Sequence, residues 1–137
     1  TFSRRKAELM IRFEKGKAVN SSDRGWIAGH MIPKTGLAST PAFEIKAWNY
    51  SEAINYGKKA FGGTEFIIIY GGRLRLILSV GKEFEFLELN GWEHEYIIIA
   101  PNVVKEVVVV ESPAFGFTVR WPSAPGLNQV VSPPEKA

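Results

Sequence analysis

Residues 65–99 read EFIIIYGGRLRLILSVGKEFEFLELNGWEHEYIII and decide the fold class. The stretch is a series of short segments rich in Ile, Leu, Phe and Tyr, separated by Gly, Lys and Asn. Such segments are typical of β-strands, because β-branched and aromatic side chains fit a pleated sheet. The pairs Gly71-Gly72 and Gly81-Lys82 predict tight turns between consecutive antiparallel strands. The stretch therefore predicts antiparallel β-structure.

Two hydropathy patterns occur within these segments. Residues 82–89 begin with a strict alternation of charged and apolar side chains, which predicts a strand with one face in water and one in the core. Residues 66–69, 97–99 and 107–110 are apolar at successive positions. Both faces of those strands must be covered, so we expect stacked sheets, an added interface, or both.

The β pattern continues on both sides of this stretch. The predicted strands cover residues 25–32, 43–50, 65–70, 73–80, 83–89, 96–99, 106–110 and 115–121. Short strands at this regular spacing predict a sandwich or a small barrel. Before them, residues 4–14 carry apolar side chains at three- and four-residue spacing, which predicts one short amphipathic α-helix.

The length of 137 residues indicates one domain. We divide it into an N-terminal helix and basic linker (1–24), a β-barrel (25–122) and a proline-rich tail (123–137). The composition, 45% hydrophobic and 23% charged without cysteine, is that of a soluble globular protein without disulfides. Because no run of about 18–20 apolar residues and no secretory signal is present, we expect a cytoplasmic protein without a membrane partner.

The net charge of +3 is unevenly distributed. Residues 1–24 carry seven Lys and Arg against three acidic residues, so the remainder of the chain is close to neutral. A nearly neutral body lacks the broad positive face that phosphate binding requires, and we expect no nucleic-acid partner. Contact of the basic segment with an acidic protein remains open, which would make the protein an interaction scaffold.

The stretch 65–74, followed by 90–92, 96–102 and 117–122, resembles the cupin superfamily. The resemblance covers about residues 43–122, and the chain is similar to a group of small bacterial single-domain cupins of poorly defined function. It implies an all-β double-stranded β-helix, the jelly-roll or cupin barrel, with two motifs enclosing a pocket. It also implies a homodimer, because small cupins commonly pair by sheet faces or edge strands.

The metal-ligand histidines of the superfamily are missing from this chain. Glu65 and Gly72 keep the end of the first motif, but the positions of its two histidines fall among Lys58, Lys59, Ala60 and Phe61. The third histidine position falls on or next to Lys105. A lysine ammonium has no lone pair for a metal, so we expect a barrel without metal or other cofactor.

Glu65 and Lys105 are the first candidates for the site. The resemblance implies that Glu65 points into the barrel, where it could act as a general acid or base or accept a hydrogen bond from a ligand hydroxyl. The alternative is a structural ion pair with Lys58, Lys59 or Lys105. Lys105 is either an anchor for a ligand carboxylate or phosphate or the partner of Glu65.

Aromatic side chains and an arginine complete the candidate set. Trp48 and Tyr50 share a strand face because they are two residues apart, and with Tyr56 they would line the pocket or pack in the core. Arg120 could clamp an anion or stack on Trp121. The expected ligand-binding residues are Trp48, Tyr50, Tyr56, Lys58, Glu65, Lys105 and Arg120.

Three functions follow from these residues. The first is metal-independent binding of a small polar molecule, a sugar or a carboxylate, in the barrel. The second is a metal-free sugar-type epimerase or isomerase in which Glu65 transfers a proton, and the third is the interaction scaffold. His30 on the first predicted strand is expected to be a hydrogen-bonded structural residue, and His94 an exposed one. Whether the protein is an enzyme stays open.

Overall fold

The computed structural model describes residues 11–17, 25–32 and 36–132, and this part of the chain is built from β-strands. In chain order they are β1 (Trp26–Ala28), β2 (Glu44–Tyr50), β3 (Asn55–Phe61), β4 (Thr64–Val80), β5 (Glu83–Asn90), β6 (Tyr96–Ile99), β7 (Val104–Trp121) and β8 (Asn128–Ser132). A short 3₁₀ helix, η3 (Gly91–Glu93), connects β5 to β6. The predicted all-β class is confirmed.

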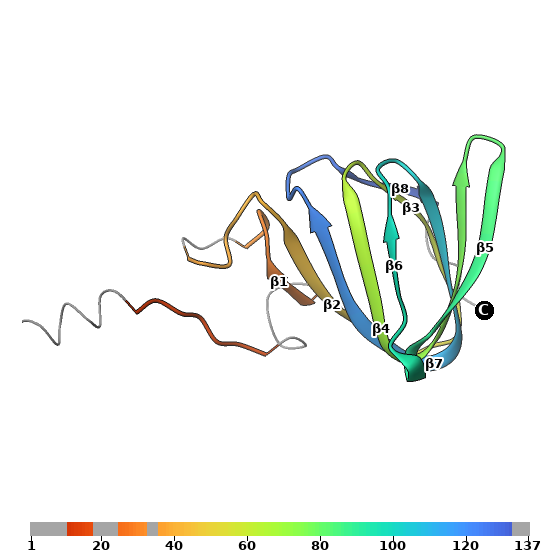
Figure 1. The fold of residues 1–137 in the computed structure, drawn as a ribbon, viewed down its shortest axis with the longest axis horizontal. Coiled ribbons are helices and arrows are strands. Elements are labelled where there is room, and N and C mark those ends of the chain that lie inside the picture. Colours follow the sequence, from red (N-terminus) through yellow and green to blue (C-terminus); the bar gives the residue numbers. More distant parts are fainter. Residues whose placement is uncertain (1–10, 18–24, 33–35, 133–137) are drawn as a thin grey trace, which may run out of the picture.

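The strands form one antiparallel sheet that folds over into two layers (Figure 1). The long strands β4 and β7 run through both layers, because each pairs with different neighbours along its length. One layer has the order β1-β2-β7-β4-β6 and the other β8-β3-β7-β4-β5. The strands lie close together at the bottom of the view and spread apart toward the top.

The predicted turn at Gly71-Gly72 is wrong, since both glycines lie inside the continuous strand β4. The pairing of β4 with β7 shifts register around them, and here both strands bend from one layer into the other. Gly72 has a φ of +75°, and a Cβ there would lie 2.5 Å from the carbonyl oxygen of Glu111. The two glycines therefore permit a corner rather than a hairpin. The turn at Gly81-Lys82, between β4 and β5, is confirmed.

Side chains from alternate positions of the strands fill the space between the layers. Ile67, Ile69 and Leu76 are buried, whereas Phe66 and Ile68 point to the opposite face of β4. The buried core cluster consists of Trp48, Ile67, Ile69, Leu74, Leu76, Leu89, Ile99, Val107, Val109 and Ala114. The core thus lies toward the closed end of the curled sheet, next to the corner.

Two strands are not among those predicted. β3 contains Gly57 and two lysines, residue types that strands disfavour, and it forms because β7 and β8 pair with it on both sides. β8 lies in the proline-rich tail and pairs with residues 58–61 of β3. In addition, β7 is one strand where two were predicted, at 106–110 and 115–121.

The predicted N-terminal helix is not observed in the part of it that the structure describes. Residues 11–14 are not helical and are exposed, while residues 4–10 lie outside the described residues. Ile11 and Phe13 are 68% and 77% exposed, so their apolar surface is not packed against a neighbour. A short helix needs such packing, which explains the difference. In the described residues no helix is long and apolar enough to span a membrane.

Candidate functional site

Four strands direct polar side chains into the open end between the two layers. Lys46, Trp48 and Tyr50 share the inner face of β2, as their spacing of two predicts. Opposite them, β3 supplies Tyr56 and Lys59. The remaining polar side chains come from β4 and β7, and they are Glu65, Lys105, Thr118 and Arg120.

Glu65 is the centre of a buried ion-pair cluster. Only 3% of the residue is exposed. Lys105 Nζ donates to Glu65 Oε1 at 2.5 Å, and Arg120 Nε donates to Glu65 Oε2 at 2.5 Å. Both carboxylate oxygens therefore carry a charge-assisted hydrogen bond, a strong type of protein hydrogen bond.

This cluster shifts the acid–base properties of its members. Burial by itself would raise the pKa of Glu65, but the positive charges of Lys105 and Arg120 outweigh burial and hold the pKa below its ordinary value of 4.5. Burial lowers the pKa of Lys105 from 10.5, and the adjacent Glu65 carboxylate opposes that effect. Glu65 is consequently ionised and a weak base at neutral pH.

The polar network continues beyond Glu65 to a second buried carboxylate. Arg120 Nη1 donates to Glu44 Oε2 at 3.3 Å, and Ser123 Oγ donates to Glu44 Oε1 at 3.0 Å. Ser123 Oγ in turn accepts from the backbone N–H of His30 at 2.8 Å. The predicted ligand-binding set did not contain Lys46, Lys59, Thr118, Glu44 or Ser123. Glu44 and Lys46 could have been found, because they precede Trp48 by four and two residues and so share its strand face.

His30 is a hydrogen-bonded structural residue, as expected, but it lies just after β1. Its Nδ1 is 2.6 Å from Ser123 Oγ. A hydroxyl has one proton, which goes to Glu44, so we infer that Nδ1 carries a hydrogen and donates it to Ser123. The Ser123 hydroxyl then has its proton and both lone pairs engaged, and it has none left for nucleophilic attack.

Three aromatic rings form one wall of the site. The rings of Trp48 and Tyr50 stack with centroids 5.0 Å apart, and those of Tyr50 and Tyr56 are 4.2 Å apart. Trp48 Nε1 donates to Thr118 Oγ1 at 3.0 Å, which fixes the indole. Burial raises the pKa of Tyr50 to about 12, so its phenol stays protonated at neutral pH.

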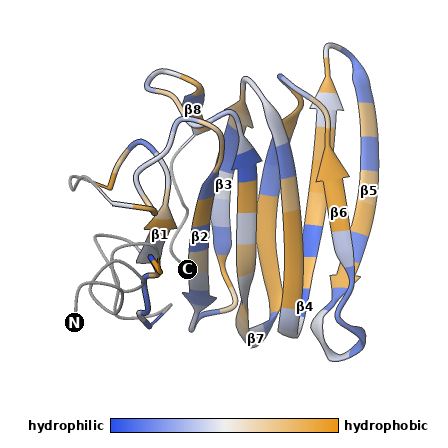
Figure 2. Ribbon diagram, turned by 60° about the vertical axis from the view of Figure 1, so that its left-hand side comes forward, coloured by the Kyte–Doolittle hydropathy of each residue, from blue (hydrophilic) through white to orange (hydrophobic). Residues whose placement is uncertain are grey.

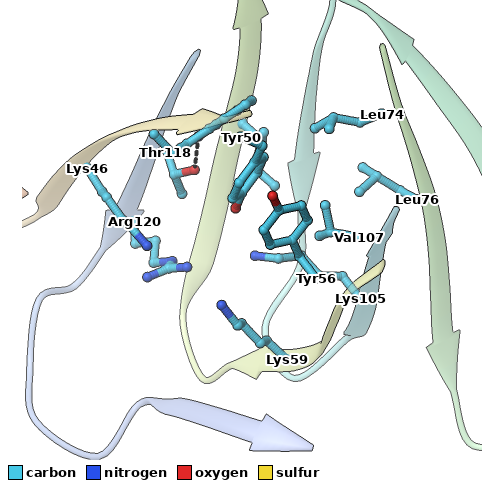
Figure 3. Close-up of a pocket in the computed structure, with 12 residues that line it drawn as sticks. Lys46, Tyr50, Tyr56, Lys59, Leu74, Leu76, Lys105, Val107, Thr118 and Arg120 are labelled. Atoms are coloured by element: carbon cyan, nitrogen blue, oxygen red, sulfur yellow. Dashed lines mark hydrogen bonds between the residues drawn. The ribbon is translucent and has the colours of Figure 1, made fainter. Parts of the chain in front are cut away.

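The space enclosed by these groups is small. The cavity has a volume of about 30 Å³, enough for roughly one water molecule. Aliphatic side chains of Ile67, Leu74, Leu76 and Val107 form its floor. Figure 3 shows the amino groups of Lys46, Lys59 and Lys105 and the guanidinium of Arg120 pointing toward a common space. The barrel interior is thus filled with core side chains, and its mouth is cationic.

Most of the expected site residues come together here. Trp48, Tyr50, Tyr56, Lys105 and Arg120 line the cavity, and Glu65 lies next to it, holding two of them.

Lys58 does not join them, because it is exposed and its neighbour Lys59 lines the cavity instead. Arg120 packs its guanidinium over the rings of Phe61 and Trp26, at 5.4 and 5.9 Å, and not over Trp121. The reason is strand alternation: Trp121 points to the other face of β7, where 41% of it is exposed. His94 follows η3, and its ring lies 4.9 Å from that of Tyr70, outside the set that lines the cavity.

The residues at this site do not fit the divalent metal that the cupin resemblance implies. Both oxygens of Glu65 are bound by cationic side chains, and one of these is Lys105, which the motif comparison places on or next to the third histidine position. Among the described residues no group of three or more His, Cys, Asp or Glu side chains could hold a metal ion. A metal at Glu65 would have to displace two cationic partners, the Lys105 ammonium and the Arg120 guanidinium.

No family model and no curated protein matches this chain, but solved structures do. Oxalate decarboxylase from Bacillus subtilis superposes with a TM-score of 0.60 at 7% identity, over 67% of this chain and 24% of its own. A 3'-monoepimerase from Streptomyces bikiniensis, in complex with dTDP-quinovose, gives 0.57 at 10% identity, over 68% of this chain and 53% of its own. Oxalate oxidase in complex with glycolate gives 0.61 at 12% identity, over 86% and 60%.

These similarities show that the chain has a cupin-type barrel fold, which confirms the fold expected from the sequence. The chain spans about a quarter of the decarboxylase and half of the epimerase. At such low identity the likeness concerns the fold, and function has to be argued from the site itself.

Proposed function

We propose that this protein binds a small carboxylate anion at the mouth of the cupin barrel, without a metal ion. The observation that carries the proposal is the convergence of Lys46, Lys59, Lys105 and Arg120 on one small cavity. Positively charged groups that face one small space create a local positive potential there, which attracts anions.

Hydrogen-bond capacity also supports an anionic ligand. The Lys105 ammonium has three donors, and one of them is placed on Glu65. The Arg120 guanidinium has five, of which one is placed on Glu65 and one on Glu44. Both cations are thus held in position by buried carboxylates while keeping further N–H groups for a ligand oxygen. Glu65 is a positioning residue in this proposal.

The size of the cavity restricts the ligand. A volume of about 30 Å³ accommodates little more than a water molecule, so a sugar ring does not fit inside the barrel as it stands. We propose that a single carboxylate group enters the cavity while the rest of the ligand stays at the rim against Tyr50 and Tyr56. This favours a small carboxylate over a sugar.

The lowered pKa of Glu65 favours binding over proton transfer. A general base works best with a pKa near the operating pH, and a carboxylate held by two cations is a much weaker base than that. The epimerase or isomerase alternative therefore has no supporting observation in this site.

The test compares ligand classes by calorimetry and thermal shift. Acetate, oxalate and succinate are titrated against glucose as the neutral control, at low and high salt. We expect stabilisation by at least one carboxylate, weakened by salt, and none by glucose. Lys59→Met should weaken binding about tenfold, because a charge-assisted contact is lost.

Lys58→Met is the matched control, since it removes the same charge from the next residue on the opposite face of β3. Equal effects of the two lysine variants, or equal stabilisation by glucose and carboxylates, would contradict the proposal.

A further inference from the structure

The inner face of the sheet continues past the cavity onto the β4–β5 hairpin. The cross-strand register places one row of side chains across β3, β7, β4 and β5, and its members are Lys59, Lys105, Leu78 and Glu85. Lys59 and Lys105 line the cavity, and Leu78 packs against the buried core. Glu85 points to the same side, because it precedes the core-contacting Leu87 by two residues on β5. The row therefore begins with two cations and ends with a carboxylate.

The far end of this row borders an open hollow of about 490 Å³, which we call the hairpin hollow. Its lining residues are Leu78, Ser79, Val80, Glu83, Phe84, Glu85 and Val103. In Figure 1 the β4–β5 hairpin rises at the open end of the curled sheet, where the strands spread apart. Figure 2 shows β5 banded with hydrophilic positions. The hairpin hollow thus combines aliphatic side chains with carboxylates.

The hairpin hollow and the cavity adjoin along β4. Leu76 lines the cavity, and Leu78, two residues further on the same strand face, lines the hollow. Leu78 is also the register partner of Lys105. Because β5 lies two strand spacings from β7, the backbones of Glu85 and Lys105 are about 10 Å apart. A ligand that occupies both spaces therefore passes over Leu78, with positive side chains at one end and Glu85 at the other.

Glu85 presents an unpaired carboxylate to the hairpin hollow. It is exposed, and among the side chains that the structure describes none forms an ion pair or hydrogen bond with it. Glu65, by contrast, has both oxygens bound by cationic side chains of the protein. A carboxylate without a protein partner, beside an aliphatic surface, is complementary to a positively charged group at the end of an apolar chain.

We propose that the site prefers ω-amino carboxylates, which carry a carboxylate at one end of an aliphatic chain and an ammonium group at the other. The carboxylate binds in the cavity beside Lys59 and Lys105. The chain lies over Leu78 and Val103, and the ammonium group contacts Glu85. This inference rests on the proposed function, because the cavity has to hold the carboxylate.

The charge of the ligand decides the direction in which its chain leaves the cavity. Tyr50 and Tyr56 line the cavity together with Lys46 and Lys59, so an ammonium group on that side would meet like charges. The remainder of a short carboxylate fits against the tyrosines, since it carries no positive charge. A long chain that ends in an ammonium group is directed instead to the hairpin hollow.

The test is calorimetry of the full chain with acetate, hexanoate and 6-aminohexanoate at low salt. We expect hexanoate to bind about tenfold tighter than acetate, because its methylene groups are removed from water in the hairpin hollow. Through the contact with Glu85, 6-aminohexanoate should bind a further three- to fivefold tighter (about), a modest gain because Glu85 is exposed. High salt should remove this second gain.

Glu85→Gln should make the affinities for hexanoate and 6-aminohexanoate equal while leaving that for hexanoate unchanged. The matched control is Glu88→Gln, which removes the same charge from the opposite face of β5 and should keep the preference. Both glutamates are exposed, and circular dichroism checks that both variants fold.

The outcomes separate this inference from the proposed function. Equal affinities for hexanoate and 6-aminohexanoate in the natural chain, or a preference that Glu85→Gln leaves intact, overturn the inference, while binding of acetate still supports the proposed function. Failure of all three carboxylates to bind overturns both.

Discussion

Glu65 is the residue on which the buried charges of the site depend. It is bound by Lys105 and Arg120 at once, and Arg120 also reaches Glu44. Removing one member of such a cluster leaves buried charge without a partner, which costs far more than the net contribution of the intact ion pair. We therefore expect the Glu65 carboxylate to make a large contribution to the free energy of unfolding.

We predict that Glu65→Gln destabilises the protein by about 3–5 kcal/mol, because two buried cations lose their common partner. Urea unfolding at neutral pH measures the loss. Lys105→Met in the same chain should restore part of it by removing one unpaired cation. As control, Glu88→Gln breaks only the half-exposed pair with Arg73 and should cost less than about 1 kcal/mol. Similar losses for both glutamine variants would refute the role of Glu65.

The same residue predicts the direction of the pH dependence. The pKa of Glu65 is lowered in the folded state, so the unfolded chain binds the proton first as the pH falls. Its stabilisation is full above the unfolded value of about 4.5 and is lost as the pH falls through the lowered folded pKa. The stability difference between the natural chain and Glu65→Gln should therefore shrink on acidification.

The sequence alone could name most residues of the site but not how they pair. Glu65, Lys105, Arg120 and the aromatic set were predicted through the cupin motifs and strand alternation. Which of the two neighbouring lysines of β3 faces the cavity depends on the register shift in β3, between residues 55 and 58, where it pairs with β7. This shift places Lys59 and not Lys58 inward, and no local sequence pattern specifies it.

At the level of the elements, the corner in β4 and β7 explains where prediction succeeded and failed. The strands themselves were found because their side chains are β-branched and aromatic. A glycine pair inside such a run is compatible with a hairpin and with a bend, and only pairing with β7 on both sides of it distinguishes the two. β3 was missed because its neighbours, not its composition, hold it in the sheet.

We predict that Gly72→Ala costs at least about 2 kcal/mol more than Gly81→Ala. Both glycines have a positive φ, of +75° and +57°, so both substitutions carry similar backbone strain. The difference is space, since a Cβ at 72 meets the backbone of β7 at 2.5–2.8 Å, whereas nothing lies within 4 Å at 81. Chemical unfolding of the two variants measures the difference, and equal losses would show that the corner is not tightly packed.

At the scale of the whole molecule, the cupin fold is combined with a barrel mouth lined by lysine and arginine side chains. The positive charge at the barrel mouth comes from side chains of the protein. The Glu65 carboxylate of the first motif binds two of them, Lys105 and Arg120. The same fold therefore holds a buried carboxylate whose partners are cationic side chains of the protein.

We predict that the protein purified without chelators contains no stoichiometric divalent metal and that EDTA leaves its unfolding midpoint unchanged. A metal that binds only the folded state would raise that midpoint, and its removal would lower it. Elemental analysis and a thermal melt before and after EDTA provide the measurement. A stoichiometric metal whose removal lowers the midpoint would contradict the metal-free site.

β4 and β7 belong to both layers, and this restricts how the molecule can open. Neither layer can detach from the other, because two continuous backbones would have to give up their pairing along most of their length. Partial opening is left to β1, β5, β6 and β8, each of which pairs with a single neighbour. Amide protons of β4 and β7 should therefore exchange last. The ion pairs of Glu65 with Lys105 and Arg120 lie on these two strands, so we expect them to be among the last contacts to open.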